Sequence, residues 1–302
     1  MPFKSAKGKD SVVSKLLKIS AASKLGLGLG GGGPTAPVST TTGGNVDNLE
    51  PGNGYVYHTF TSSGTFVLSG DPISADILVV AGGGGGGAGS VFSPTTSGGG
   101  GGGVAWITTV NMDPGTFPVT IGPGGSGGPD STNPKSGTNG GDTLFGPGTP
   151  LPITAKGGGF GAGEGPPTNG QPGGSGGGAR SPNMPGGASI QHSENGPLVP
   201  LGLMNFGSPA VNTTGGGVAG AGPGTGGNPG GKALTNYDFE GDQIGVNPFG
   251  AVFGGGGGYR DGGSTGTPGG GYGGGGGGGP NGASGTQGIV IVRYLKEYSP
   301  PS

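Results

Sequence analysis

The sequence predicts a mostly β protein in which strands at the two ends of its main body enclose a block of glycine-rich segments packed side by side. Glycine supplies 88 of the 302 residues, in runs of up to seven. One run, residues 82–87, follows the short apolar β run at 77–80 through Ala81. The order is reversed near the other end, where glycines 273–279 lead through a short turn-like segment to the strand GIVIVRY at 288–294.

Composition by itself would suggest collagen or disorder, because only 28% of the residues are hydrophobic and 9% are charged. Collagen is excluded, since the glycines never keep a strict Gly-X-Y period. Disorder is disfavoured because the net charge is only −2 and the apolar residues gather in β-patterned blocks at both ends of the glycine region. We therefore expect an ordered protein.

Residues 1–25 form a separate basic unit, with six lysines against the single acid Asp10. Apolar residues at helical spacing predict an amphipathic helix from about Ser11 to Lys24 that ends at Gly26. We expect this helix to dock onto a partner protein; a membrane surface or a solvated tail are the alternatives. The partner-docking side chains are Val12, Val13, Leu16, Leu17 and Ile19.

The rest of the chain divides into a flexible Gly/Thr/Pro linker at 26–53 and a glycine-rich body at 54–302. The β runs at 55–61 and 65–70, separated by turn residues, predict a hairpin. Further strands are expected at 77–80, 104–110, 117–125 and 288–294. No apolar run approaches the roughly 20 residues of a membrane span, and Ser14, Lys15 and Lys18 interrupt any signal-peptide core.

Polyproline II geometry offers a way to order long glycine runs. Its backbone amides point outward, so helices without side chains can approach closely and hydrogen-bond to neighbours on several sides. Any Cβ directed inward would separate the helices. Alanine and serine are therefore expected at the rim, and a glycine-to-valine change within 98–103 should be severely destabilising.

Four segments carry a family resemblance: HTFTSSGTFVLSG (58–70), DILVVAGGGGGGAG (76–89), FPVTIGPGGSGG (117–128) and GIVIVRY. Together they resemble glycine-rich virion proteins of tailed bacteriophages, including the glycine-rich domain of tail-tip adhesins. More distantly, they are similar to the glycine-rich ectodomain of some receptor tyrosine kinases. The resemblance covers residues 55–294 and leaves the basic N-terminus unmatched. It implies a jelly-roll-like β-sandwich fused to a bundle of polyglycine II helices, located in the virion, with host recognition through loops at one end.

No catalytic or cofactor motif stands out. Matches to GxGxxG are expected by chance at this glycine content, and GGKA at 230–233 lacks the Ser/Thr of a P-loop. His58 is expected to be a side chain of the hairpin. The acids Asp238, Glu240 and Asp242 have a spacing that fits Ca²⁺, although a solvated loop is the preferred interpretation. We expect no enzyme, no cofactor and no metal site.

Aromatic and polar side chains in the loop inserts are the candidates for recognition, because aromatic rings stack on sugars or anchor protein partners. The alternative is that they fill gaps around the glycine bundle. The residues singled out are His192, Phe206, Tyr237 and Phe239.

The predicted function is therefore that of a phage tail fibre or appendage subunit. It would bind other virion proteins through residues 1–25 and a host surface glycan or protein through its loops. A capsid decoration or head fibre protein is the alternative, and a polysaccharide-degrading enzyme is disfavoured because no close acid pair is evident. The acidic body argues against nucleic-acid binding. A homo-oligomer such as a trimer stays open.

Overall fold

The computed structural model describes residues 39–49, 54–90, 96–129, 135–180, 183–210, 238–239, 242–243 and 271–296. These residues belong to one compact unit, residues 38–302. The helix predicted at 11–24 lies outside the described residues, and so do its five docking side chains.

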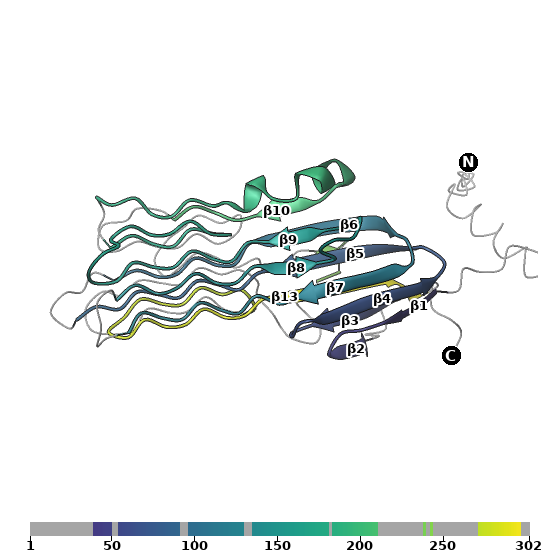
Figure 1. The fold of residues 1–302 in the computed structure, drawn as a ribbon, viewed down its shortest axis with the longest axis horizontal. Helices are drawn as coiled ribbons and strands as arrows, with labels where there is room; N and C mark the ends of the chain where they lie inside the picture. The colour runs from purple at the N-terminus through teal and green to yellow at the C-terminus, as the bar shows by residue number, and fades with distance from the viewer. Residues whose placement is uncertain are drawn as a thin grey trace, which may run out of the picture. The chain divides into compact units, whose positions relative to one another are not determined.

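The described body is mostly β, as predicted, and consists of two antiparallel sheets (Figure 1). In spatial order, the five-stranded sheet contains β1 (Ser39–Thr42), β4 (Gly64–Gly70), β7 (Gly115–Thr120), β8 (Thr143–Phe145) and β9 (Ile153–Ala155). The six-stranded sheet contains β10 (Met204–Phe206), β6 (Val104–Met112), β5 (Ile73–Val80), β13 (Ile289–Leu295), β3 (Tyr55–Phe60) and β2 (Val46–Leu49). A separate pair is formed by β11 (Asp238–Phe239) and β12 (Asp242–Gln243), and the two 3₁₀ helices are η1 (Gln191–Ser193) and η2 (Gly196–Leu201).

The two sheets pack face to face around an inner core. From the five-stranded sheet, Phe66, Phe117 and Phe145 are buried, with the last two rings stacked at a centroid distance of 5.6 Å. They meet side chains such as Ile77 and Val292 of the six-stranded sheet in one cluster. A second group, the outer cluster, lies on the opposite face of the six-stranded sheet. It consists of Leu78, Val80, Val104, Trp106, Ile289 and Ile291.

The strands predicted at the two ends of the glycine region are confirmed, and they are direct neighbours. β13 lies between β5 and β3, with Ile289 opposite Val80 and Leu295 opposite Tyr55. The last described strand therefore lies inside the six-stranded sheet, between two of the first strands of the body.

The predicted hairpin at 55–70 is wrong. β3 belongs to the six-stranded sheet and β4 to the five-stranded sheet, so the chain crosses the core between them. The cause is that both strands direct large side chains into the same core: His58 of β3 contacts Phe66 of β4 edge to face, at 5.2 Å between ring centroids. Two strands that face each other across a core cannot also lie side by side in one sheet.

The predicted linker at 26–53 also differs from the structure, because residues 39–49 contain β1 and β2. β1 pairs with β4, and β2 pairs with β3. The Thr-rich stretch is fixed by His58, which is fully buried. Its Nδ1 lies 2.8 Å from the Gly43 carbonyl and donates to it; in the neutral imidazole its Nε2 then accepts from the Thr41 hydroxyl, at 2.8 Å.

The glycine segments continue the strands of both sheets without a break (Figure 1). Residues 82–89 extend β5, 122–128 extend β7 and 157–163 extend β9, whereas 97–103, 135–141 and 282–288 lead into β6, β8 and β13. We call these segments, together with 171–178, 186–190, 207–210 and 273–279, the glycine bundle. Side chains hold packed sheets about 10 Å apart, but backbones without side chains can come close enough for direct hydrogen bonds.

Segment 82–89 is the centre of the glycine bundle and bonds to six neighbouring segments with a period of three residues. The amides of Gly82, Gly85 and Ala88 donate to carbonyls 141, 138 and 135 of one neighbour. In the same way, residues 81, 84 and 87 donate to segment 97–103, and residues 83 and 86 donate to segment 283–286. Its carbonyls accept from three further segments, 158–164, 125–128 and 276–279. These bonds are 2.7–3.1 Å long.

Candidate functional site

The described body has two distinct ends. Ser39, the first described residue, pairs with Gly70 and donates its hydroxyl to the Asp71 carbonyl just before β5 begins. β13 likewise ends at Leu295, far from the glycine bundle that precedes it. Both ends of the described body therefore lie at the side opposite the bundle, whereas Ser90, Lys135 and Glu164, where three bundle segments end or begin, lie together at the bundle's free end.

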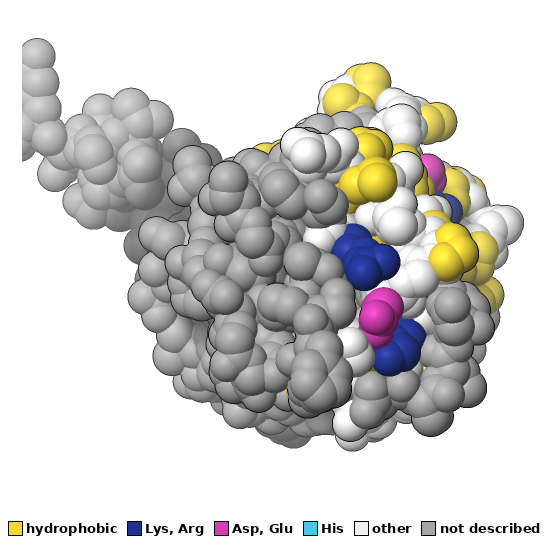
Figure 2. All heavy atoms as spheres, turned by 90° about the vertical axis from the view of Figure 1, so that its left-hand side faces the viewer, with side chains coloured by type: hydrophobic (Ala, Val, Ile, Leu, Met, Phe, Trp, Pro, Cys, Tyr) yellow, Lys and Arg dark blue, Asp and Glu magenta, His cyan; other side chains and the backbone are white. Residues whose placement is uncertain are grey.

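The free end of the bundle carries charged side chains of both signs (Figure 2). Glu164 accepts from Lys135 Nζ at 3.0 Å and from the Ser90 amide at 3.1 Å. The Lys135 hydrogen bond, followed by that from Ser90, holds the pKa of the Glu164 carboxyl below its ordinary value. These bonds fasten three bundle segments to one another where the loops begin.

The lowered pKa of Glu164 predicts a pH dependence. A carboxyl whose pKa is depressed in the folded state stabilises the fold above its unfolded pKa, and this contribution is lost as the pH falls through the folded value. In an NMR titration, we expect the Glu164 midpoint to move upward in Lys135→Met. Lys156→Met, which removes the partner of Asp142 instead, should leave it in place. A midpoint unaffected by Lys135→Met would contradict this assignment.

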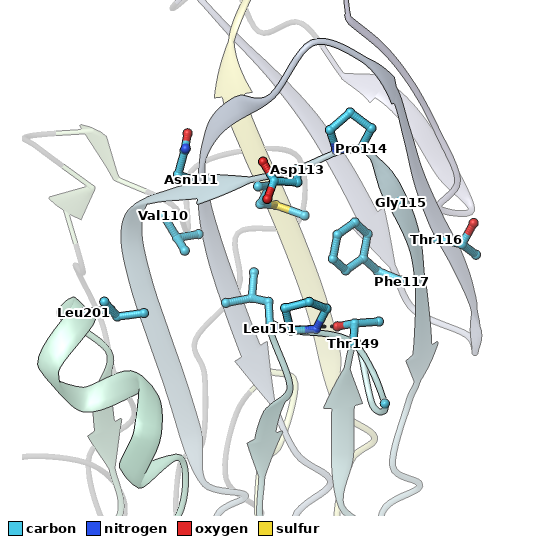
Figure 3. A pocket seen from close by; sticks show the side chains of 13 residues that line it. Val110, Asn111, Asp113, Pro114, Gly115, Thr116, Phe117, Thr149, Leu151 and Leu201 are labelled. Atoms are coloured by element: carbon cyan, nitrogen blue, oxygen red, sulfur yellow. Dashed lines mark hydrogen bonds between the residues drawn. The ribbon is translucent and has the colours of Figure 1, made fainter.

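The opposite end of the body holds a pocket of about 400 Å³ between the β6–β7 turn, the β8–β9 turn and η2 (Figure 3). Its floor is apolar, formed by the buried side chains of Met112, Phe117 and Leu151. Leu201 of η2 stands at its rim and is 61% exposed. Among the lining residues only Asp113 carries a titratable carboxyl, so this pocket suits an apolar side chain and offers no acid–base pair.

The residues predicted for recognition are not brought together by the described part of the chain. Phe206 lies in edge strand β10, half-buried against the outer cluster. His192 lies on η1, beside β10, and Phe239 lies in β11; their side chains are outside the described residues. Tyr237 is not described.

Sequence analysis missed a cluster of three side-chain amides, Gln191, Asn195 and Asn205, which we call the amide cluster. The Asn195 side chain accepts from the backbone amide of Thr154 in β9 and donates to the Thr154 carbonyl, each at 2.8 Å. Gln191 accepts from the Lys156 amide at 2.7 Å and donates to Asn205 at 2.9 Å. The amide cluster thereby occupies the open edge of β9 and joins it to β10 of the other sheet, protecting an edge that could otherwise pair with another chain.

Replacing Gln191, the central residue of the amide cluster, should destabilise the protein. Gln191 is fully buried, and Gln191→Leu leaves the Lys156 amide without its acceptor. We expect a loss of about 2–3 kcal/mol in the free energy of unfolding measured in urea. Ser193→Ala is the matched control on the same 3₁₀ helix, because Ser193 is exposed and donates only locally to Ile190; its effect should stay within about 0.5 kcal/mol. Equal effects of the two changes would contradict a role of the amide cluster.

Chemistry at the described residues is limited. No group of three or more His, Cys, Asp or Glu side chains there is placed to hold a metal ion. The acids of the 238–242 stretch have side chains outside the described set. Within the same set, no helix has the length and apolar character needed to cross a bilayer.

Comparison with known proteins adds one finding. Residues 59–295 match the family model described as a glycine-rich domain. This range runs from β3 to the end of β13 and therefore includes the glycine bundle and the strands that enter it. A search of curated proteins found no match.

Proposed function

Because the chain belongs to the glycine-rich domain family, we propose that it is a structural protein of a phage virion, an appendage or tail-fibre subunit without enzymatic activity. Its body acts as a rigid mount. Residues 1–25 attach it to other virion proteins, and the loops at the free end of the glycine bundle meet the host surface, where they contact a glycan or a protein.

The mount, in this proposal, is a bundle of polyglycine II helices joined to a jelly-roll-like sandwich. Polyglycine II has three residues per turn and outward-pointing amides. The three-residue period of the bonds around segment 82–89 and its six bonded neighbours support this conformation. A segment held from six sides has little freedom to bend.

The observation that carries the proposal is the opposite placement of attachment and loops. The chain enters the described body at Ser39 and reaches Leu295 at the sandwich end, while Ser90, Lys135 and Glu164, where bundle segments end or begin, lie at the other end. An N-terminal anchor would therefore point toward the particle and the loops would point away from it.

Removal of residues 1–25 tests the attachment. We expect particles assembled with the truncated chain to lack the protein, while its thermal midpoint stays that of the full chain, because these residues lie outside the compact unit at 38–302. A truncated chain that still enters the particle would contradict docking through this segment.

Binding of the purified, labelled full chain then distinguishes the appendage role from capsid decoration. Binding to host cells that is competed by unlabelled protein supports the appendage role. Binding to capsids alone would replace it with capsid decoration.

A further inference from the structure

The pocket at the sandwich end is an opening in the inner core. Its floor residues Met112, Phe117 and Leu151 belong to the core cluster and are each at most 7% exposed. Figure 3 shows Val110, Phe117 and Leu151 arranged around one space. The volume of about 400 Å³ lies within the range of ligand-binding pockets, about 300–1,000 Å³. The core therefore has room for an apolar group that comes from outside.

The two connections beside the pocket explain why it is open. The chain passes from β6 to β7 through only Asp113 and Pro114, and Gly148 and Pro150 lie in the connection between β8 and β9. All four residues are exposed. Gly148 has a φ of 78°, and an added Cβ there would meet no atom within 4 Å. The connections therefore place short side chains around the mouth and leave the floor open.

The charge at the mouth of the pocket is negative. Asp113 is exposed, and it is the only charged residue among those that line the pocket. The chain after residue 25 is acidic as well, with seven basic and fourteen acidic residues. Like charges brought together oppose association, and opposite charges favour it. A basic occupant therefore complements this site better than a second acidic copy of the chain.

Apolar side chains are also exposed on η2, which carries the rim of the pocket. Leu201 is 61% exposed and Val199 is 49% exposed, whereas Leu198 is buried in the core cluster and holds this helix in place. Exposed apolar surface beside a pocket is typical of a protein contact. A peptide segment can fill the pocket and cover such side chains together, whereas a small molecule in the pocket would leave them in water.

We propose that this pocket binds a segment of another protein in which an apolar side chain stands next to a lysine or an arginine. The apolar side chain would lie on Met112, Phe117 and Leu151, and the neighbouring cation would pair with the Asp113 carboxylate at the mouth. This inference goes beyond the proposed function and does not depend on it, because it rests on the pocket and η2 alone.

Two synthetic peptides of matched length, GKLKG and GELEG, each blocked at both ends, test the proposal by methyl NMR on the full chain. We expect GKLKG to shift the Met112 and Leu151 methyl signals saturably, with a dissociation constant at least about fivefold lower than that of GELEG. Asp113→Asn should remove this difference. Asp71→Asn is the matched control, because Asp71 is exposed but does not line the pocket; it should preserve the difference.

Several outcomes would overturn the proposal. Met112 and Leu151 signals that respond to neither peptide would show that the pocket takes no such segment, and a preference for GKLKG that survives Asp113→Asn would remove the role of the carboxylate. A Met112 signal that changes when the protein alone is diluted would identify a second copy as the occupant. A Met112 signal that changes in Leu16→Ser/Leu17→Ser, without any peptide, would identify the chain's own N-terminal residues instead.

Discussion

Replacing Gly86 with alanine should lower the free energy of unfolding by about 3 kcal/mol or more. For a domain of this size, that corresponds to a decrease of roughly 6–12 °C in the thermal midpoint. Gly86 is in the centre of the bundle, and a Cβ there would lie closer than 3.0 Å to the carbonyl of Gly277. Alanine can be accepted only if a neighbouring segment moves, which breaks bonds on that side of segment 82–89.

Gly196→Ala is the matched control. Gly196 lies in η2, where an added Cβ would meet no atom within 4 Å. The same chemical change is therefore expected to leave the thermal midpoint nearly unchanged or to raise it slightly, since alanine reduces the freedom of the unfolded chain. If calorimetry showed equal midpoints for Gly86→Ala and Gly196→Ala, close packing of the glycine bundle would be refuted.

Loss of the Asp76 carboxylate should cost a similar amount or more. Arg293 is 1% exposed and donates through Nε to Asp76 Oδ2 at 2.8 Å, with its guanidinium carbon 4.4 Å from the centre of the Tyr55 ring. Asp76 Oδ1 also accepts from the Thr109 amide at 2.8 Å, where the pairing of β5 and β6 shifts register. Asp76→Ala leaves a buried charge without its carboxylate, so we expect a loss of about 3–5 kcal/mol in urea unfolding.

The double variant Asp76→Ala/Arg293→Met distinguishes charge burial from simple loss of packing. Removing both charges should recover much of the stability lost in Asp76→Ala, because no isolated charge then remains in the sheet. A double variant less stable than the single variant by the full effect of Arg293→Met alone would show that the two side chains act independently.

The strands next to the glycine runs could be predicted because their signals are local. Val79 and Val80 lie in an unbroken apolar run, as do Ile289 and Val290, and such runs identify strands buried on both faces. It was also predictable that the glycine run after β5 is ordered, because a run enclosed between buried strands has neighbours with which its amides can bond.

Features that depend on distant partners could not be predicted. The turn at 61–63 looks like that of a hairpin, but only the packing of His58 against Phe66 shows that the chain crosses between sheets. Thr41 gave no strand signal because its strand is fixed by bonds to His58 and to Tyr294, 253 residues away. The prediction that alanine and serine stay at the rim was wrong for Ala88, Ser97 and Ser175, which are fully buried. The Ser97 hydroxyl, for instance, bonds to the carbonyls of Ala162 and Gly178 and so joins the network.

The candidate site was even less accessible from the sequence. Gln191 and Asn195 lie in a segment whose sequence is that of an ordinary polar loop. Their side-chain amides bond to the backbone at and just after β9, and the sequence does not reveal that β9 lies beside them. A usable signal would have been the asparagine at position 195. Asparagine is among the few residues that readily adopt the left-handed backbone conformation, and Asn195 has a φ of 59°.

Amide hydrogen exchange along segment 82–89 is the most direct test of the central claim that backbone without side chains forms a solid, cross-bonded core. Since each of its amides donates to a neighbouring segment, these amides should exchange as slowly as those of β5, near the limit set by global unfolding. Exchange at the rate of an unstructured glycine peptide, with β5 still protected, would contradict the account.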